Sequence, residues 1–373
     1  MLPSASTPRL VTVSAYGHAG PSSRVRVYDW LRHLEASSTN HDYLGAADAS
    51  FRRIMSRPGA AFRSEMALRR LSGRLVDATL LLSRTATPLT TGRLEAGLLT
   101  AARRGVYDFD DALYADRRGG VHRLFAKPRA WSRAVAAADV VVAGNATLAQ
   151  AAREYNDAVV VVPSCVEPGD YDAKDSYEVT GRPNLVWVGS PATEQYLAHL
   201  APALSRLHAA CDAVVTVVSR GDRPFPGMDH MVRRVDWSPA AAREQLARAD
   251  LALAPLVDDE FTRGKCAYKL LQYGAAGVPT VGSPVGVNRT VLQDLGGSAA
   301  ADLEQWFARV ADVLAMAPAD RAELGRRARA AVAETYSYGA WAPVFWRILF
   351  PDLPWSAPDA GAPPHRASPG DER

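Results

Sequence analysis

The sequence is poor in lysine and cysteine and has no long apolar run. Only four lysines stand among its 43 lysines and arginines. The three cysteines are widely spaced, which indicates neither a metal-binding pair nor a disulfide framework and suits a reducing cytoplasm. No apolar run is long enough to cross a bilayer, and residues 1–9 lack the apolar core of a secretory signal. We therefore expect a cytoplasmic protein.

A strong charge imbalance is also absent. The net charge is only +3, which gives no reason to expect binding to nucleic acid. The content of 48% hydrophobic and 22% charged residues is that of a soluble globular protein, and 373 residues exceed what one ordinary core requires. The richness in Ala, Arg, Gly and Pro is typical of a high-GC genome, such as an actinobacterial one. The chain is expected to form two domains.

Short apolar strands alternate with helices along most of the chain. Leu10–Ser14 reads as a first strand, followed by a glycine-containing loop and an amphipathic helix over Arg24–Leu34. A second series of this kind begins with the strand Asn184–Gly189 and a helix over Glu194–Ala209. Further apolar strands are expected at Ala78–Ser83 and Val232–Val235. Such alternation predicts parallel, doubly wound sheets. The first loop lacks a full G-x-G-x-x-G pattern, so a dinucleotide-binding fingerprint is not supported.

These patterns also suggest domain boundaries. Residues 1–180 form the expected first domain and residues 183–337 the second, with a polar linker between them. The aromatic, amphipathic segment 338–350 is expected to be the last helix. Residues 352–373 are rich in Pro, Ala and Gly, and we expect a disordered tail there.

The segment Asp258–Arg289 carries the strongest local signal. Apolar residues at roughly helical spacing end at Gly277 and Pro279, a short strand follows, and a glycine-rich turn closes the unit. Two of the four lysines, Lys265 and Lys269, stand near the expected start of the helix. A compact ammonium and a helix N-terminus both suit a phosphate group. The alternative is an ordinary solvated helix start.

This segment resembles the donor-binding segment of GT-B glycosyltransferases, particularly the retaining family-4 enzymes. The matching residues are Arg263–Lys265, Lys269–Leu271, Tyr273, Ala275–Gly277, Pro279 and Ser283–Asn288. The resemblance extends from about Arg24 to Phe350. It implies a GT-B fold, in which two doubly wound Rossmann-like domains face a cleft, with the last helix crossing back to the first domain.

The resemblance also implies a donor site in the second domain. Its expected members are Gly189, Ser190, Thr193, Arg263, Gly264, Lys265, Lys269 and Gln272. Gly189, Ser190 and Thr193 would hold the pyrophosphate, although the two hydroxyl residues could simply cap the following helix. Gln272 stands where many members place the second glutamate of an E-x7-E pair that holds the donor ribose, and the first glutamate position falls near Gly264. The pair is therefore lost, which leaves the nucleotide open.

Three carboxylates end the strand that begins near Gly105. Asp108, Asp110 and Asp111 stand where a parallel strand delivers its carboxyl end to a ligand crevice. They resemble the D-x-DD segment of the same glycosyltransferase branch, which implies a role beside the reacting sugar. The surrounding pattern does not favour a metal-binding D-x-D motif, and helix capping is the alternative interpretation. With Lys269, these three are the expected catalytic residues.

Two further regions have weaker signals. The resemblance implies that the first loop, with Gly20, Ser23 and Arg24, faces the cleft, and a plain strand-to-helix turn explains it equally well. Residues 44–75 contain seven arginines. They could attract an anionic acceptor or a membrane surface, but a solvated helix face is the preferred interpretation in a chain so rich in arginine.

The sequence therefore predicts transfer of a sugar from a nucleotide-diphosphate sugar to a small metabolite or an envelope glycan. Retention, independence of metal and the absence of a cofactor are expected, as is at most peripheral contact with a membrane. Three alternatives remain: a sugar-nucleotide epimerase, a pseudo-glycosyltransferase, and a non-catalytic nucleotide-binding subunit. The loss of glutamate at Gln272 keeps the last of these open.

Overall fold

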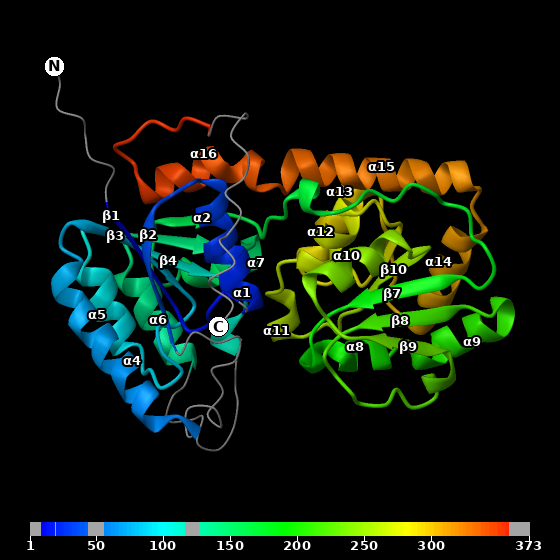
Figure 1. Ribbon diagram of the computed structural model, residues 1–373, viewed down its shortest axis with the longest axis horizontal. Helices are drawn as coiled ribbons and strands as arrows, with labels where there is room; N and C mark the ends of the chain where they lie inside the picture. Colours follow the sequence, from blue (N-terminus) through cyan, green and yellow to red (C-terminus); the bar gives the residue numbers. More distant parts are fainter. Residues whose placement is uncertain (1–8, 19, 44–55, 116–126, 358–373) are drawn as a thin grey trace.

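Two parallel sheets, one from each half of the chain, organise the structure (Figure 1). The computed structural model describes residues 9–18, 20–43, 56–115 and 127–357. Part of the arginine-rich region, including Arg52 and Arg53, and the expected tail from residue 358 onward lie outside these ranges. None of the helices in the described ranges is both long and apolar enough to span a membrane.

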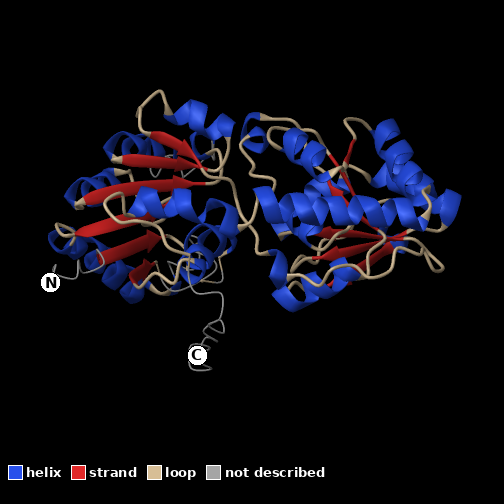
Figure 2. Ribbon diagram, turned by 90° about the horizontal axis from the view of Figure 1, so that it is seen from above, coloured by secondary structure: helices blue, strands red, loops and turns tan. Residues whose placement is uncertain are grey.

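The first sheet has six strands in the order β2-β1-β3-β4-β5-β6. Its strands are β1 (Arg9–Ser14), β2 (Ser38–Asp42), β3 (Ala78–Ser83), β4 (Arg104–Phe109), β5 (Val140–Ala143) and β6 (Val159–Val161). The central strands have apolar residues on both faces because helices cover the sheet on both sides, as Figure 2 shows. The polar strand β2 lies at the edge, where the sequence gives no apolar alternation, and it was not predicted.

Helices of the first domain pack around this sheet. They are α1 (Pro21–Ser23), a π-helical turn η1 (Arg24–Tyr28), α2 (Asp29–His33), α4 (Pro58–Leu71), α5 (Arg93–Ala101), α6 (Lys127–Ala137) and α7 (Ala146–Ala152), with 3-10 turns η2 (Ser72–Arg74) and η3 (Leu113–Ala115). The predicted helix over Arg24–Leu34 is thus the latter part of a continuous run of helical turns that starts at Pro21.

The second sheet has the order β12-β11-β10-β7-β8-β9, again with parallel strands. Its strands are β7 (Asn184–Val188), β8 (Val214–Val218), β9 (Val232–Val235), β10 (Leu251–Ala254), β11 (Thr280–Gly282) and β12 (Ser298–Ala299). In both sheets the chain order reverses once, between β1 and β3 and between β7 and β10. Ligands of such sheets bind at the carboxyl ends of the strands beside this reversal.

The second domain contains eight further α-helices in the described chain. They are α8 (Glu194–Ala198), α9 (Ala201–Cys211), α10 (Pro239–Ala247), α11 (Glu260–Arg263), α12 (Tyr268–Ala275), α13 (Asn288–Leu295), α14 (Leu303–Ala315) and α15 (Pro318–Thr335), with 3-10 turns η5 (Pro168–Asp170), η6 (Pro191–Thr193) and η7 (Asp229–Met231). The sequence suggested a single helix from Glu194 to Ala209. The structure divides it because Pro202 starts a new helix, in which its missing N–H costs nothing.

The segment with the two lysines also differs from expectation. Instead of one helix start bearing both lysines, α11 ends at Arg263 with Gly264 as its C-cap, and α12 begins after Ala267, whose φ of 54° is left-handed. Lys265 therefore lies in the connection between two helices, while Lys269 lies in the first turn of α12.

The last helix, α16 (Tyr338–Leu349), packs on the first domain beside α2 (Figure 1). The rings of Phe345 and Trp30 stack with their centroids 4.3 Å apart. The chain crosses between the domains twice, and Val166 and Ser337 form a parallel β-bridge where the two crossings meet. Residues 352–357, the first part of the expected tail, are described, and Trp355 contacts Trp346 of α16.

Candidate active site

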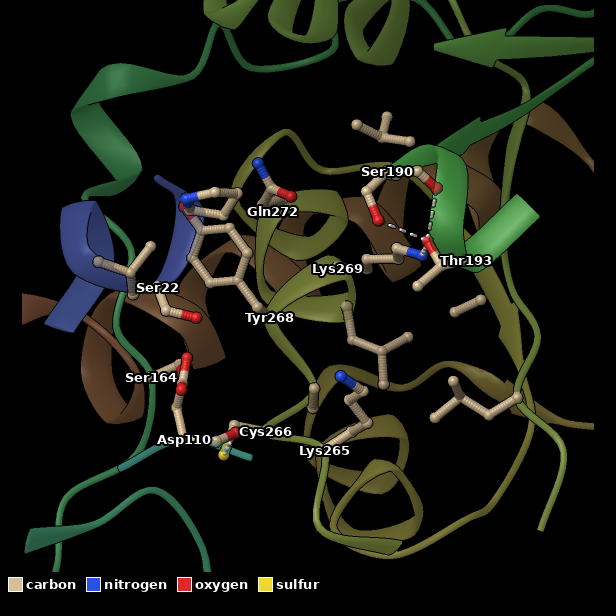
Figure 3. Close-up of a pocket in the computed structure, with 18 of the residues that line it drawn as sticks. Ser22, Asp110, Ser164, Ser190, Thr193, Lys265, Cys266, Tyr268, Lys269 and Gln272 are labelled. Atoms are coloured by element: carbon tan, nitrogen blue, oxygen red, sulfur yellow. Dashed lines mark hydrogen bonds between the residues drawn. The ribbon is translucent and has the colours of Figure 1, made fainter. Parts of the chain in front are cut away.

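A cavity of about 380 Å³ lies between the two domains, at the carboxyl ends of strands from both sheets. The first domain contributes Pro21, Ser22, Arg24, Val25, Asp110, Asp111 and Ser164 to its wall; the polar residues of the opposite wall include Ser190, Thr193, Arg220, Lys265, Lys269, Gln272 and Asn288. Figure 3 shows Ser22, Ser164 and Asp110 on one side and Lys269, Ser190 and Thr193 on the other.

The predicted site residues separate into two groups. Nine line the cavity: Arg24, Asp110, Asp111, Gly189, Ser190, Thr193, Lys265, Lys269 and Gln272. The other five, Gly20, Ser23, Asp108, Arg263 and Gly264, do not.

Asp108 is a correction to the predicted catalytic set. Its side chain is fully buried and pairs with Arg26, whose Nη2 lies 2.5 Å from the carboxylate Oδ1. Arg26 also donates to the carbonyls of Val162 and Pro163, each at 2.9 Å. Burial raises the pKa of the Asp108 carboxyl, and Arg26 opposes that rise. The side chain thus connects β4 to the segment after β6 rather than facing the cavity.

Three other predicted residues, Arg263, Gly20 and Ser23, do not line the cavity. The exposed Arg263 pairs with Asp258, with 2.6 Å between Nε and Oδ1, because α11 turns this face toward solvent. Gly20 and Ser23 are buried within the turn that starts α1. The neighbouring Arg24 does reach the cavity, and its guanidinium carbon lies 5.7 Å from the ring centroid of Trp237 in the second domain.

Gly264 has a packing role between the domains. A Cβ atom at this position would lie 2.7 Å from the Ala112 Cβ and 3.0 Å from a methyl of Leu148. Asn145, the N-cap of α7, donates from Nδ2 to the carbonyls of Gly264 and Lys265 at 3.0 and 3.1 Å. The connection between α11 and α12 therefore docks directly on the first domain.

Asp110 and Asp111 follow β4, and one arginine binds both. The Arg84 Nη1 lies 2.8 Å from Asp110 Oδ1 and 2.7 Å from Asp111 Oδ2. Arg84 therefore holds both carboxylates together at the end of β4. The sequence indicates Arg84 only by its place directly after the predicted strand Ala78–Ser83, and its partners became visible only in three dimensions.

Lys265 joins the two walls. Its Nζ lies 2.7 Å from Asp111 Oδ1, across the domain boundary. Burial alone would lower the pKa of this ammonium, but the Asp111 carboxylate more than offsets burial and the pKa is raised. Burial would likewise raise the pKa of Asp111, yet Lys265 and Arg84 lower it to about 2. Both partners are therefore charged at neutral pH.

Lys269 has a different environment. Its Nζ lies 4.3 Å from the ring centroid of Trp187 and 3.4 Å from Thr193 Oγ1. Burial, followed by the positive charge of Lys265, lowers the pKa of Lys269 to about 7. A Cβ atom at Gly189 would lie 2.9 Å from this Nζ, so glycine leaves the space that the lysine occupies. An anion in the cavity would favour the charged form of Lys269.

The turn after β7 places two hydroxyls beside Lys269. Ser190 Oγ and Thr193 Oγ1 lie 3.4 Å apart, and neither side chain caps a helix. The Gly189 amide does not face the cavity as a free donor, because it donates to the Val218 carbonyl at 3.1 Å. The hydroxyl groups, rather than that amide, are the polar groups which the turn offers to a ligand.

Arg220 and Asn288 line the cavity without a role assigned by the sequence, beside Gln272 of the expected donor site. Arg220 lies over the Trp237 ring at 5.3 Å, on the aromatic residue that Arg24 also contacts. Asn288 Oδ1 is buried without a hydrogen-bond partner. Gln272 donates from Nε2 to the Tyr171 hydroxyl at 3.0 Å, so its amide is partly engaged in the free protein. Arg220 and Asn288 reach the cavity only through the tertiary fold, so no local motif in the sequence reveals them.

Within the described ranges, no group of three or more His, Cys, Asp or Glu side chains is arranged to hold a metal ion. The carboxylates that face the cavity are paired with cations instead. Arginine and lysine cations thus neutralise the aspartate carboxylates at this site.

Comparison with known proteins identifies the fold. The structure resembles sucrose-phosphate synthase from Thermosynechococcus elongatus with a TM-score of 0.70 and 12% identity, over 93% of this chain and all of the other. It also resembles Anabaena HepE, solved with UDP and glucose, at 0.69 and 13% over 93% and 100% of the chains. WaaG, a glycosyltransferase involved in lipopolysaccharide biosynthesis, gives 0.65 and 14% over 91% and 99%. No curated protein sequence matches the chain.

Two doubly wound domains with a cavity between them form the GT-B arrangement, and the predicted fold is confirmed. Residues 182–316 match the family model described as glycosyl transferases group 1.

Proposed function

We propose that the protein transfers a sugar from a nucleoside diphosphate sugar to a hydroxyl or amine of an acceptor. The observation that carries the proposal is the meeting of Lys269, Ser190 and Thr193 at the end of β7, with Lys265 on the same wall. Two ammonium groups and two hydroxyls in a half-enclosed cavity suit a diphosphate. The nucleotide would extend toward Trp237 and Gln272.

The proposed chemistry depends on charge that grows as the glycosidic bond breaks. The leaving diphosphate gains negative charge in the transition state, and fixed cations stabilise this charge more than they stabilise the bound donor. Lys269 and Lys265 would supply that stabilisation, which supports a reaction without a metal ion. Retention is proposed from the resemblance of Arg263–Asn288 to the retaining enzymes.

The acceptor is proposed to bind against the first domain. Ser22, Ser164 and Asp110 line that wall and offer hydrogen-bonding groups to a polyol. We propose a cell-envelope glycan or a small metabolite as acceptor and a cytoplasmic location, with no cofactor. The similarity to WaaG, a protein involved in lipopolysaccharide biosynthesis, supports including glycan acceptors in the tests.

The first test identifies the donor. Thermal unfolding in the presence of UDP, GDP, dTDP or ADP would select the nucleotide, and the corresponding labelled sugar donor would then be incubated with glycan and small-molecule acceptors. A labelled glycoside supports the proposal. A changed sugar still attached to nucleotide would indicate an epimerase instead, and a nucleotide that binds without any turnover would indicate a binding subunit.

Lys269→Ala tests the mechanism. Removing one preorganised charge from a transition state typically lowers kcat by about 100- to 1000-fold, and we expect this loss at saturating donor with a smaller change in acceptor KM. Lys174→Ala is the matched control, since Lys174 lies outside the cavity and over the Tyr177 ring. An unchanged kcat for Lys269→Ala would remove this residue from the mechanism.

A further inference from the structure

Arg84 has a backbone conformation that an L-residue rarely adopts. It directly follows β3, and its φ of 64° is left-handed. Such a conformation costs of order 1–3 kcal/mol and persists only when surrounding contacts hold it. Here the Arg84 amide donates to the Asp108 carbonyl, and the Tyr107 hydroxyl donates to the Arg84 carbonyl, both at 2.8 Å. Contacts with β4 therefore fix the direction in which the side chain leaves the backbone.

One nitrogen of the Arg84 guanidinium connects the end of β3 to α1 and to the segment after β4. Its Nη1 donates to Asp110 Oδ1, to Asp111 Oδ2 and, at 2.8 Å, to Ser22 Oγ of α1. The Arg84 side chain is 13% exposed, and each aspartate side chain is 14% exposed. All three acceptors belong to residues that line the cavity, although Arg84 itself does not line it.

Without this guanidinium, two neighbouring carboxylates would share a partly buried site. Like charges in such a site raise each other's pKa, and one carboxylate commonly takes up a proton. Lys265 contacts Asp111 but not Asp110. Within the described ranges, other ionisable groups that interact with Arg84 or the pair are Arg26, Asp108, Cys266, Tyr16, Tyr107 and Tyr196. Among the described residues, Arg84 is the cation that forms an ion pair with both carboxylates.

We propose that Arg84 is a positioning residue for the transfer reaction. It holds Asp110 and Asp111 as a fixed pair on the first-domain wall, and through Asp111 it sets the position of Lys265 beside the leaving diphosphate. This inference rests on the proposed function of the same site. A left-handed arginine bound to cavity groups is explained by such a role, because an ordinary turn would accept glycine without the strain.

Arg84→Gly tests the charge of the side chain while the left-handed backbone conformation is kept. Glycine adopts the left-handed conformation freely, so this variant removes the guanidinium without adding backbone strain. We expect kcat/KM near neutral pH to fall at least tenfold, with its acidic limb moved upward by about 1–3 pH units as the carboxylates lose a cation. Arg84→Lys should recover much of the activity, and guanidinium chloride at non-denaturing concentration should partly rescue Arg84→Gly.

A second readout does not need the reaction. Titration of ¹³C-labelled aspartate carboxyl groups in the free protein, assigned with Asp110→Asn and Asp111→Asn, reports the two pKa values directly. We expect at least one to rise by about 1–3 units in Arg84→Gly. Glu35→Gly is the control. It likewise replaces a residue with a left-handed backbone, but at an exposed position, and should leave both pKa values unchanged.

The outcomes separate the two proposals. Wild-type carboxyl titration and wild-type kcat/KM in Arg84→Gly would overturn the role of Arg84. If Arg84→Gly does not fold, Arg84→Gln gives the same comparison with a neutral side chain of similar shape. If the wild-type protein transfers no sugar from any donor, the proposed function fails, and the carboxyl titration still decides whether Arg84 maintains the pair.

Discussion

Lys265 and Lys269 stand four residues apart and differ in their electrostatic environment. Lys265 has a carboxylate partner, Asp111, which raises its pKa. Lys269 has an indole ring and a hydroxyl beside it, and no aspartate or glutamate within the described ranges forms an ion pair with it. Its ammonium therefore remains available for an anion that enters the cavity, at a pKa lowered to about 7.

This difference predicts that binding of a nucleotide sugar takes up a proton. A pKa lowered to about 7 leaves a neutral fraction of Lys269 in the free protein near pH 7, and a bound diphosphate would raise this pKa again. Above pH 7 the affinity should fall by up to ~10-fold per pH unit, because the proton must be supplied before the contact forms. Calorimetry in buffers of different ionisation enthalpy would measure this uptake as a fraction of a proton per bound donor near pH 7.

Two variants serve as controls for the proton uptake. Lys269→Met should weaken binding below pH 7 and abolish the dependence on pH, while Lys174→Met should keep both the affinity and the slope. An affinity that stays constant from pH 6 to about pH 9 in the wild-type protein would contradict the assigned role of Lys269.

At the scale of elements, the connection between α11 and α12 joins the domains. Its glycine lies against Ala112, its lysine pairs with Asp111, and Cys266 Sγ lies 3.2 Å from the Asp110 carbonyl. A helix continued through residues 264–267 would not place the carbonyls of Gly264 and Lys265 against Asn145. The break in the predicted helix is therefore what allows the second domain to contact the first.

We predict that Gly264→Ala weakens this contact. The added methyl would meet backbone and Cβ atoms of Ala112 that cannot move easily, and overpacking of this kind typically costs about 1–3 kcal/mol. Urea unfolding would measure the loss, and small-angle X-ray scattering would report a larger separation of the domains. Gly97→Ala is the control, because that exposed helical position has open space and alanine should stabilise it by up to ~1 kcal/mol.

At the scale of the whole molecule, the last helix completes the first domain. Tyr338, Phe345 and Leu349 of α16 belong to one apolar cluster with Leu10 and Trp30. The Thr79 hydroxyl also donates to the Leu349 carbonyl at 3.1 Å, which ties the helix end to β3. The early elements β1 and α2 thus share one apolar core with the late helix α16.

Phe345→Ala should therefore destabilise the first domain. Phe345 is fully buried against Trp30, and loss of such a ring typically costs about 3–5 kcal/mol. Val344→Ala, on the exposed side of the same helix, should change the free energy of unfolding by less than about 0.5 kcal/mol. Denaturant unfolding followed by tryptophan fluorescence measures both, and equal effects would contradict the packing described.

Much of this architecture could be predicted from the sequence because buried parallel strands are continuous apolar runs. Ala78–Ser83 and Val232–Val235 have the predicted bounds. The edge strands β2 and β12 could not be found, since one is polar and the other has only two residues. At the site, the lysines stood out by their scarcity, whereas the pairing of Asp108 with Arg26 and of Asp110 with Arg84 depends on residues brought together from distant segments.

The shared core has a consequence for biosynthesis. The ribosome makes β1 and α2 early, yet the side chains that cover them on α16 emerge only after the entire second domain has been translated. Residues 184–335, in contrast, supply their own strands and helices in one continuous stretch. We therefore expect residues 184–335 to fold first during synthesis. The apolar surface of β1 and α2 stays partly exposed until α16 has been made.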